Sequence, residues 1–208
     1  MSLISKLLIE PVVDWILQDK VAHNKSNTIL TIELVPFTMH GKNLRAVLSK
    51  EHWREVCAFT HNLHRHRCLE CGRDRLKAKL ECHEQWEYSY RGYTDSQNKY
   101  KTIGVMRMER LLTLCHECHM GKHIKLAEKK GEYEHTKEHL KKVYGLTDLQ
   151  FKWKVHKAVK KVREQSKFNY ELDLTFMNHQ RYGFIQRAIG RQFTSNDNRY
   201  CFSKTDHE

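Results

Sequence analysis

The sequence has almost no proline and no stretch rich in glycine and serine, so it contains no flexible linker of a familiar kind. Its only prolines are Pro11 and Pro36, and domain borders must therefore be read from changes in residue pattern. It also lacks an internal repeat and any run of about eighteen apolar residues, the length that a helix needs to cross a bilayer. The last absence excludes a membrane-spanning helix.

Acidic residues are scarce relative to basic ones. The 208 residues include 37 Lys and Arg against 25 Asp and Glu, which gives a formal net charge of +12. Such a charge favours a polyanionic partner, and nucleic acid is the leading candidate. An anionic membrane surface would attract the same charge, and many basic proteins bind nothing acidic specifically. The N-terminus carries Glu10 and Asp14 and lacks a small-residue cleavage site, so we expect no secretion signal.

The cysteines do not suggest a disulfide framework. There are seven, an odd number, and four of them form two C-x-x-C pairs, Cys68 with Cys71 and Cys115 with Cys118. Two such pairs can complete a tetrahedral four-thiolate zinc site, a usage typical of a reducing compartment. The 43 residues between Cys71 and Cys115 leave room for a hairpin or an irregular loop. We predict one structural Zn²⁺ here, closed to substrate because protein ligands fill all four positions.

Several histidines lie beside these cysteines without a role in the zinc site. His119 and His123 are four residues apart, so a helix would present both on one face, at a spacing suited to one divalent metal. His83 lies between the two cysteine pairs, on a strand-like apolar background. If a hairpin folds this strand against the helix, the three histidines form a site with an open position for water or a phosphate oxygen. The alternative is that these are surface histidines, since the chain has 15.

Local signals predict elements on both sides of the cysteine block. The β-branched stretch 28–35 predicts a strand that stops at Pro36. Ser49 is a predicted N-cap for a helix that leads toward the first cysteine pair. Pro11 predicts a short helix near the N-terminus, and Gly131 predicts a helix end in the lysine-rich segment after the second pair.

A further helix is predicted by a capping box. Thr147 and Gln150 form this box, and an apolar stripe continues to about Ser166. Lysines cover much of the remaining surface of this helix. They predict either an ordinary solvated face or a phosphate-contacting face, two alternatives that look the same in one sequence. The candidate nucleic-acid contacts on it are Lys157, Lys160 and Lys161.

Taken together, these motifs resemble the HNH endonuclease superfamily, in a bacterial and phage group with zinc knuckles. The resemblance covers roughly residues 33–144. It implies an α+β fold with a ββα-metal core, stabilised by a four-cysteine structural zinc and flanked by helices. It also implies an N-terminal extension over 1–32, an HNH-like domain over 33–145 and a basic helical extension over 146–208. The matching motifs are C-L-E-C-G at residues 68–72, E-C-H-E-x-W from Glu81, L-C-H-E-C-H-M-G-K-H from Leu114, E-L-V-P from Glu33 and N-L-R from Asn43.

The activity implied by the resemblance is metal-dependent hydrolysis of phosphodiester bonds in DNA. His83, His119 and His123 would hold Mg²⁺ or another divalent cation, and Glu84 would be the general base. In the other possible register His83 is the base and Cys82 a ligand, which is less suited to a hard metal. The resemblance further implies double-stranded DNA as partner and the cytoplasm of a bacterial cell or a phage-infected host as location.

The chain departs from the family pattern at one named position. Arg110 stands where the family has the asparagine that orients the base, and arginine has no acceptor to replace it. Arg110 is therefore either a clamp for the scissile phosphate or a sign that catalysis has been lost. The second hypothesis is accordingly a catalytically inactive, zinc-dependent module that binds nucleic acid or protein. Lys122, between two of the histidines, is another candidate phosphate contact. Neither the oligomeric state nor the role of residues 168–208 follows from the sequence.

Overall fold

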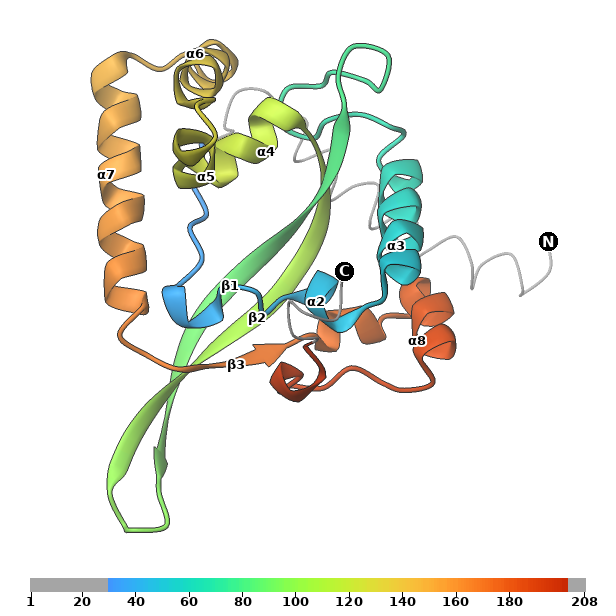
Figure 1. Ribbon diagram of the computed structural model, residues 1–208, viewed down its shortest axis with the longest axis vertical. Helices are drawn as coiled ribbons and strands as arrows, with labels where there is room; N and C mark the ends of the chain where they lie inside the picture. The colour runs from blue at the N-terminus through green and yellow to red at the C-terminus, as the bar shows by residue number, and fades with distance from the viewer. Residues whose placement is uncertain (1–29, 202–208) are drawn as a thin grey trace, which may run out of the picture.

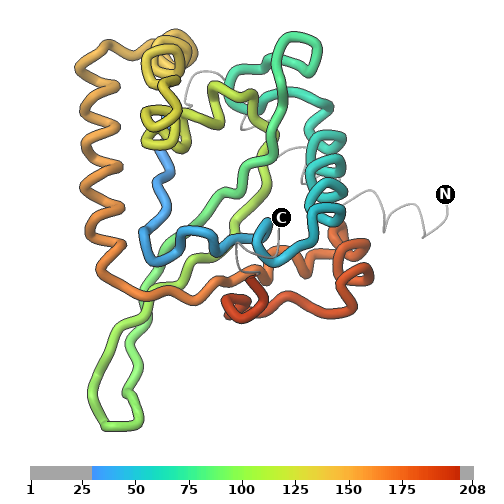
Figure 2. Tube along the Cα trace, in the orientation of Figure 1, coloured from blue at the N-terminus to red at the C-terminus, as the bar shows by residue number. Residues whose placement is uncertain are grey.

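The protein has an α+β fold in which helices lie on both sides of a long β-hairpin (Figures 1 and 2). The computed structural model describes residues 30–201. None of the helices in this range combines the length and apolar character needed to cross a bilayer. The helices are α2 (Leu44–Val47), α3 (Lys50–Leu63), α4 (His116–Lys122), α5 (Ile124–Lys129), α6 (Tyr133–Tyr144), α7 (Asp148–Gln165) and α8 (Gly183–Ile189); the strands are β1 (Leu80–Thr94), β2 (Tyr100–Cys115) and β3 (Tyr170–Asp173); the short 3-10 turns are η1 (Phe37–Met39), η2 (Thr175–Asn178), η3 (Gln180–Tyr182) and η4 (Asn198–Tyr200).

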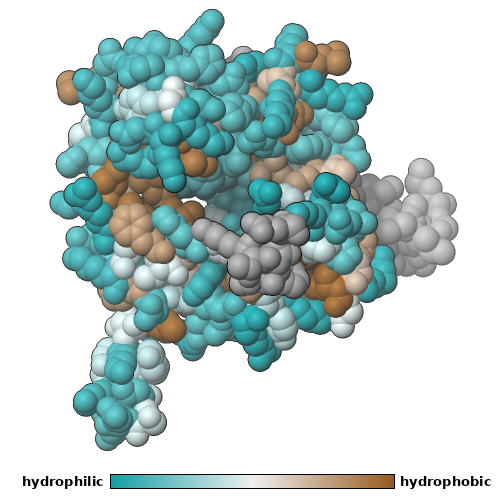
Figure 3. All heavy atoms as spheres, in the orientation of Figure 1, coloured by the Kyte–Doolittle hydropathy of each residue, from teal (hydrophilic) through white to brown (hydrophobic). Residues whose placement is uncertain are grey.

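The sheet has the order β1-β2-β3, so β1 is an edge strand. β1 and β2 are antiparallel from the Leu80–Cys115 pair to the Thr94–Tyr100 pair, whereas β3 is parallel to β2 over four residues. Beyond β3 the hairpin continues alone and projects from the body of the molecule with a hydrophilic surface (Figures 1 and 3). The hairpin base thus lies within the fold, next to both cysteine pairs.

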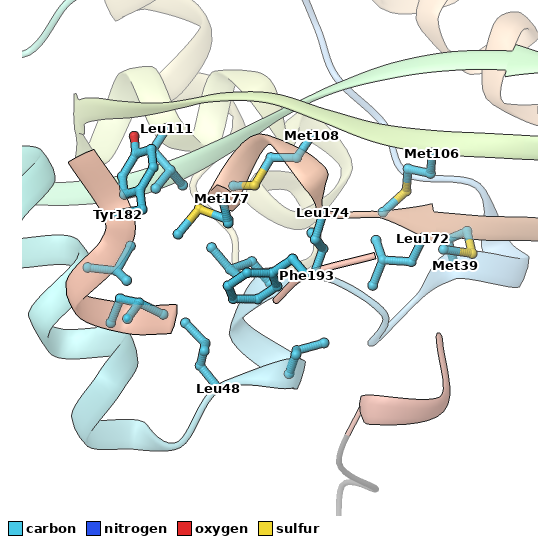
Figure 4. Packing of buried hydrophobic residues seen from close by; sticks show 14 of the residues in the cluster. Met39, Leu48, Met106, Met108, Leu111, Leu172, Leu174, Met177, Tyr182 and Phe193 are labelled. Carbon is cyan, nitrogen blue, oxygen red and sulfur yellow. The ribbon is translucent and has the colours of Figure 1, made fainter. Parts of the chain in front are cut away.

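Two buried hydrophobic clusters flank the hairpin. The larger one joins α2, α3, β2, β3 and α8, and Met106, Met108 and Leu111 of β2 point into it (Figure 4). The smaller one lies under α4 to α7 and includes Leu30 and Phe151. Segments after residue 145 contribute to both clusters, so the predicted border there does not separate an independent core. The sequence signals after 145 are strong only for α7, which is why this shared packing was not predicted.

Most local predictions within the described range are confirmed. Ser49 caps α3 by accepting from the His52 N–H, and both hydrogen bonds of the Thr147 capping box are present. Gly131 follows α5 with a φ of +75°.

The strand predicted over 28–35 is wrong for its described part. Residues 30–35 form no ladder; their apolar side chains Leu30, Ile32 and Leu34 pack into the smaller cluster instead. Packing against helices thus outweighs the β-propensity of this stretch, and its Glu33 N–H donates to the Lys122 carbonyl of α4 at 2.8 Å. The helix predicted after Pro11 lies outside the described residues.

The contact between β2 and β3 depends on the absence of a side chain at Gly104. A Cβ atom at Gly104 would lie 2.2 Å from Cε1 of Tyr170, so the ring of Tyr170 lies directly on the glycine. Tyr170 is 3 % exposed and its hydroxyl donates to the Gln165 carbonyl at 3.0 Å. The short parallel strand and the end of α7 are therefore anchored by one aromatic ring.

We expect Gly104→Ala to lower the free energy of unfolding by about 1–3 kcal/mol, the usual cost of overpacking a buried site. The added methyl group must displace the Tyr170 ring, which is held by its hydroxyl. Urea denaturation checks this. Thr102→Ala, at an exposed position of the same strand, is the control and should change stability by less than about 0.5 kcal/mol. Equal stability of the two variants would contradict the prediction.

Candidate metal centres and the cleft beside them

The four paired cysteines converge at the base of the hairpin. Their sulfur atoms all lie within 4.8 Å of one another, and the Sγ atoms of Cys71 and Cys115 are 3.6 Å apart. We call this group, Cys68, Cys71, Cys115 and Cys118, the cysteine cluster. Three of its members are buried, and four thiolates at this spacing match the tetrahedral ligand set of structural zinc. The cluster could therefore hold a metal such as zinc, as the sequence predicted.

The backbone around each pair explains the convergence. In the first pair, the Gly72 N–H donates to the Cys68 carbonyl at 2.9 Å, and the Cys68 N–H donates to the Arg73 carbonyl at 2.8 Å. Gly72 has a φ of +76°, a conformation that favours glycine and closes this tight turn. The second pair starts at Cys115, the last residue of β2 and the N-cap of α4, so strand and helix deliver one thiol each.

Two cationic side chains lie against the cysteine cluster. Nη2 of Arg73 is 3.0 Å from Sγ of Cys115, and Nε2 of His139 is 3.2 Å from Sγ of Cys118. Hydrogen bonding to Cys115 and Cys71 raises the pKa of His139 to about 9. Four thiolates outnumber the charges of a zinc ion, so both groups offset the excess negative charge. The sequence analysis missed them; the basic residue directly after the knuckle glycine was the available signal for Arg73, and His139 on distant α6 had none.

The three predicted histidines also come together. His83 projects from β1, His119 from α4 and His123 from the end of α4, and their potential ligand atoms lie within 4.8 Å of one another. Their ring centroids are 5.0–5.2 Å apart. We call these residues the histidine cluster; this spacing allows one cation to bind all three. Cys82, the ligand in the other register, lies apart from it, with its thiol against Cys57.

Two carboxylates orient the histidine cluster from behind. Oε2 of Glu33 is 3.0 Å from Nε2 of His83, and a carboxylate oxygen of Glu81 contacts Nδ1 of His119. These contacts leave the opposite ring nitrogens for a metal, an arrangement common around metal-bound histidines. Glu81 and His83 are two residues apart on one strand, so they share a face. That periodicity could have revealed Glu81; Glu33 comes from a segment that no local pattern links to His83.

The charge states suit metal binding. Burial, together with the neighbouring histidines His83 and His119, lowers the pKa of His123 to about 3, and burial also lowers the pKa of His83. Burial opposes ionisation of Glu33, but hydrogen bonds and charges from His83 and Lys122 prevail and lower its pKa to about 2. Near neutral pH His83 and His123 are thus uncharged, as metal ligands must be, with a charged carboxylate behind His83.

Lys122 does not have the position expected of a phosphate contact. Its side chain is 4 % exposed, and its Nζ lies 2.8 Å from Oε1 of Glu70 and 3.2 Å from Oε1 of Glu33. It also donates to Oγ1 of Thr31 at 2.6 Å. The structure therefore places the charge of Lys122 in a buried ion-pair network with Glu33 and Glu70, partners that only the tertiary fold supplies, and not at the surface where a phosphate would bind.

A cleft of about 360 Å³ opens along the outer edge of β1 and reaches the histidine cluster. Its lining includes Glu84, although Glu84 and His83 project from opposite faces of the strand. Both can border one cleft because β1 is an edge strand. Oε1 of Glu84 accepts from the Arg45 N–H at 3.0 Å, and burial raises the pKa of this carboxyl to about 7. We call this space the histidine cleft.

Arg110 does not border the histidine cleft. Its Nε donates to Oε1 of Gln85 at 2.8 Å, and its side chain lines a different cavity, beside Leu63 and Phe176. The prediction of a catalytic role for Arg110 at the scissile phosphate is therefore not matched by its location. The bulge between Gln85 and Trp86 shifts the pairing of the strands next to this residue, which sequence alone did not reveal.

The three lysines predicted as nucleic-acid contacts are exposed on α7. Nζ of Lys157 lies 3.7 Å from the ring centroid of Trp153, which is 55 % exposed. Lys161 also lines a small cavity that reaches His83 and His123. One side of α7 thus carries positive charge toward the region of the histidine cluster.

We expect Cys115→Ser to lose the metal of the cysteine cluster and the cooperative thermal transition, because a structural zinc supplies folding free energy. Zinc content by mass spectrometry and thermal melting followed by circular dichroism check this. Cys57→Ser is the matched control and should keep both, since Cys57 lies outside the cluster. A zinc-free Cys115→Ser protein that melts cooperatively like the wild type would contradict the prediction.

Comparison with known proteins gives no family for the chain. No protein-family model, no curated protein and no solved structure matches it. The resemblance to HNH endonucleases therefore stays a prediction from the motifs, and the two clusters and the cleft carry the functional argument.

Proposed function

We propose that the protein is a metal-dependent endonuclease of the HNH type that hydrolyses phosphodiester bonds in DNA. The observation that carries the proposal is the histidine cluster, in which one strand of a hairpin and the helix that follows it direct three imidazoles to one point beside an open cleft. Hairpin and helix in this order are what a ββα-metal core requires. The cysteine cluster at the hairpin base would hold the structural zinc of such a core.

The roles of the surrounding residues follow from their contacts. A divalent cation in the histidine cluster would supply Lewis-acid activation of the phosphodiester bond. Glu33 and Glu81 hold two of the imidazoles in orientation through their outer ring nitrogens. Glu84 accepts the proton of the attacking water, because its pKa near 7 suits a general base at neutral pH.

The donor set narrows the choice of cation. The histidine cluster offers three nitrogen ligands, whereas Glu33 and Glu81 are engaged behind the rings. Imidazole suits Zn²⁺, Ni²⁺ or Fe²⁺, and Mg²⁺ prefers oxygen ligands. We therefore expect a transition-metal ion to bind here more tightly than the Mg²⁺ implied by the family resemblance.

Positive charge supports DNA as the substrate. The chain carries a net charge of +12, and Lys161, one of the exposed lysines of α7, lines a cavity that reaches His83 and His123. Duplex DNA is bound chiefly through its phosphates, with a strong dependence on salt. A cytoplasmic location in a bacterial cell or phage-infected host is part of this proposal.

A second candidate function is a zinc-dependent binding module without catalysis. It is favoured by Arg110, which occupies the sequence position of the base-orienting asparagine and borders a cavity other than the histidine cleft. Such a module would still use the cysteine cluster for folding and the basic surface for binding.

Incubation of the protein with supercoiled plasmid and Mg²⁺, Mn²⁺, Ni²⁺ or Zn²⁺ separates the two functions. We expect nicked or linear DNA from the wild type and none from His119→Ala, because a three-ligand site loses its metal with one ligand. His156→Ala, an exposed histidine of α7, is the matched control and should cleave normally. If the protein binds plasmid but leaves it intact with every ion, the binding module takes the place of the nuclease as the function of the protein.

Glu84→Gln tests the assigned general base. We expect cleavage to slow by roughly 100-fold or more, the usual scale for losing such a group, while metal binding and DNA affinity stay unchanged. Glu87→Gln, at an exposed position on the same strand, should cleave at the wild-type rate. If Glu84→Gln is as active as this control, Glu84 is not the base.

A further inference from the structure

A second cavity continues the histidine cleft away from the histidines. It has a volume of about 370 Å³ and lies at the start of α3. Arg45 and Trp53 line both spaces, so the two are contiguous across these side chains. Together the two adjoining cavities extend from the edge of β1 to the start of α3, a path in which each part has the volume of an ordinary ligand pocket.

The side chains along this path are strongly asymmetric in charge. Its basic members outnumber the acidic ones, since within residues 30–201 Glu84 is the one carboxylate that lines it. That carboxylate already accepts the Arg45 N–H at 3.0 Å. For Arg45 and Arg54 the structure records no ion pair with residues 30–201. The basic side chains of the path are Lys42, Arg45, Lys50 and Arg54.

We propose that this path is a binding track for the phosphodiester backbone next to the scissile bond. One strand runs from the histidine cleft over Arg45 and Trp53 to the cavity at Lys50 and Arg54. The proposal rests on the proposed function, because it takes the histidine cluster as the place of cleavage. It adds the site where the flanking phosphates bind, which no motif in the sequence indicated.

The chemistry of the lining favours phosphodiester over other anions. A guanidinium group presents a planar set of donors that matches two phosphate oxygens, and two such groups occur along the path. Trp53 lines the same cavity as both arginines and is partly buried against the larger hydrophobic cluster. An aromatic surface beside cationic groups suits a chain of alternating phosphates and apolar sugar or base surfaces.

The track also explains an arrangement at Arg45. Its backbone N–H holds Glu84, the proposed base, while its side chain lines the junction of the two cavities. A phosphate bound by the guanidinium of Arg45 would thus contact the same residue whose backbone N–H positions the base. Binding of the strand and the position of the general base depend on one and the same short helix, α2.

The test compares two double variants with the same change in net charge. Lys50→Glu with Arg54→Glu removes the far end of the track; Lys130→Glu with Lys142→Glu alters exposed lysines outside it. We measure the affinity of each full-length protein for a short labelled DNA duplex by fluorescence anisotropy at several salt concentrations, without added divalent metal. This readout is independent of cleavage.

We expect the track variant to bind at least about 10-fold more weakly than wild type, and its log affinity to depend less steeply on log salt by about 0.9 per lost phosphate contact. The control variant should change affinity by less than about 3-fold and keep the wild-type slope. If both variants lose DNA affinity equally, only the net charge of the protein determines binding, and the proposal of a track is wrong. It is also wrong if the wild type binds polyglutamate but no DNA, since the partner would then be an acidic protein.

The outcomes separate the track from the nuclease. If the wild type binds DNA through Lys50 and Arg54 but does not cleave plasmid, the binding site is supported and the enzymatic function is wrong. If the wild type cleaves plasmid, and the track variant binds and cleaves like the control, the enzymatic function is supported and the track is wrong.

Discussion

The buried ammonium group of Lys122 connects the two candidate metal centres. It is held by Glu70, which lies between the first two cysteines, and by Glu33, which orients His83. Burial opposes its charge, yet these two carboxylates raise the pKa of Lys122 above its ordinary value. Breaking such a pair leaves a buried charge uncompensated, at a typical cost of about 3–5 kcal/mol. The cysteine cluster and the histidine cluster are therefore fixed relative to each other by electrostatics as well as by the chain.

The short helix α4 makes this connection possible. Cys118 faces the cysteine cluster, His119 the histidine cluster and Lys122 the two carboxylates, so three side chains of one helix serve three tasks. Gly121 leaves room for Leu140 of α6, whose Cδ1 would lie 2.5 Å from a Cβ at that position. Close packing of α6 also brings His139 to the thiolates. A metal in the cysteine cluster would thus stabilise the helix that carries two of the three histidine ligands.

The sequence predicted the parts of this assembly that repeat locally and missed those that depend on distant segments. Cysteine spacing and the i, i+4 histidines indicated both clusters, because the geometry of metal coordination restricts the spacing of ligand residues along the chain. Glu33 and His139 show no such spacing, since they meet their partners His83 and Cys118 across 50 and 21 positions of sequence. The same limit explains Lys122 and Arg110: their residue types suited phosphate, but their environments came from the tertiary fold. The tail beyond residue 168, whose role did not follow from the sequence, supplies β3 and seven of the fifteen buried residues of the larger cluster.

The edge position of β1 has a consequence for the chemistry of the cleft. In a central strand, side chains at successive positions face separate layers, so His83 and Glu84 would never meet one substrate. At an edge, a cleft can reach around the strand and include both, as it does here. An open edge also exposes unpaired backbone groups, which proteins usually cover or charge. Here the segment around Lys42 and Arg45 lies along that edge and carries positive charge, so the edge of β1 is covered by a charged segment in the way that opposes pairing with another chain.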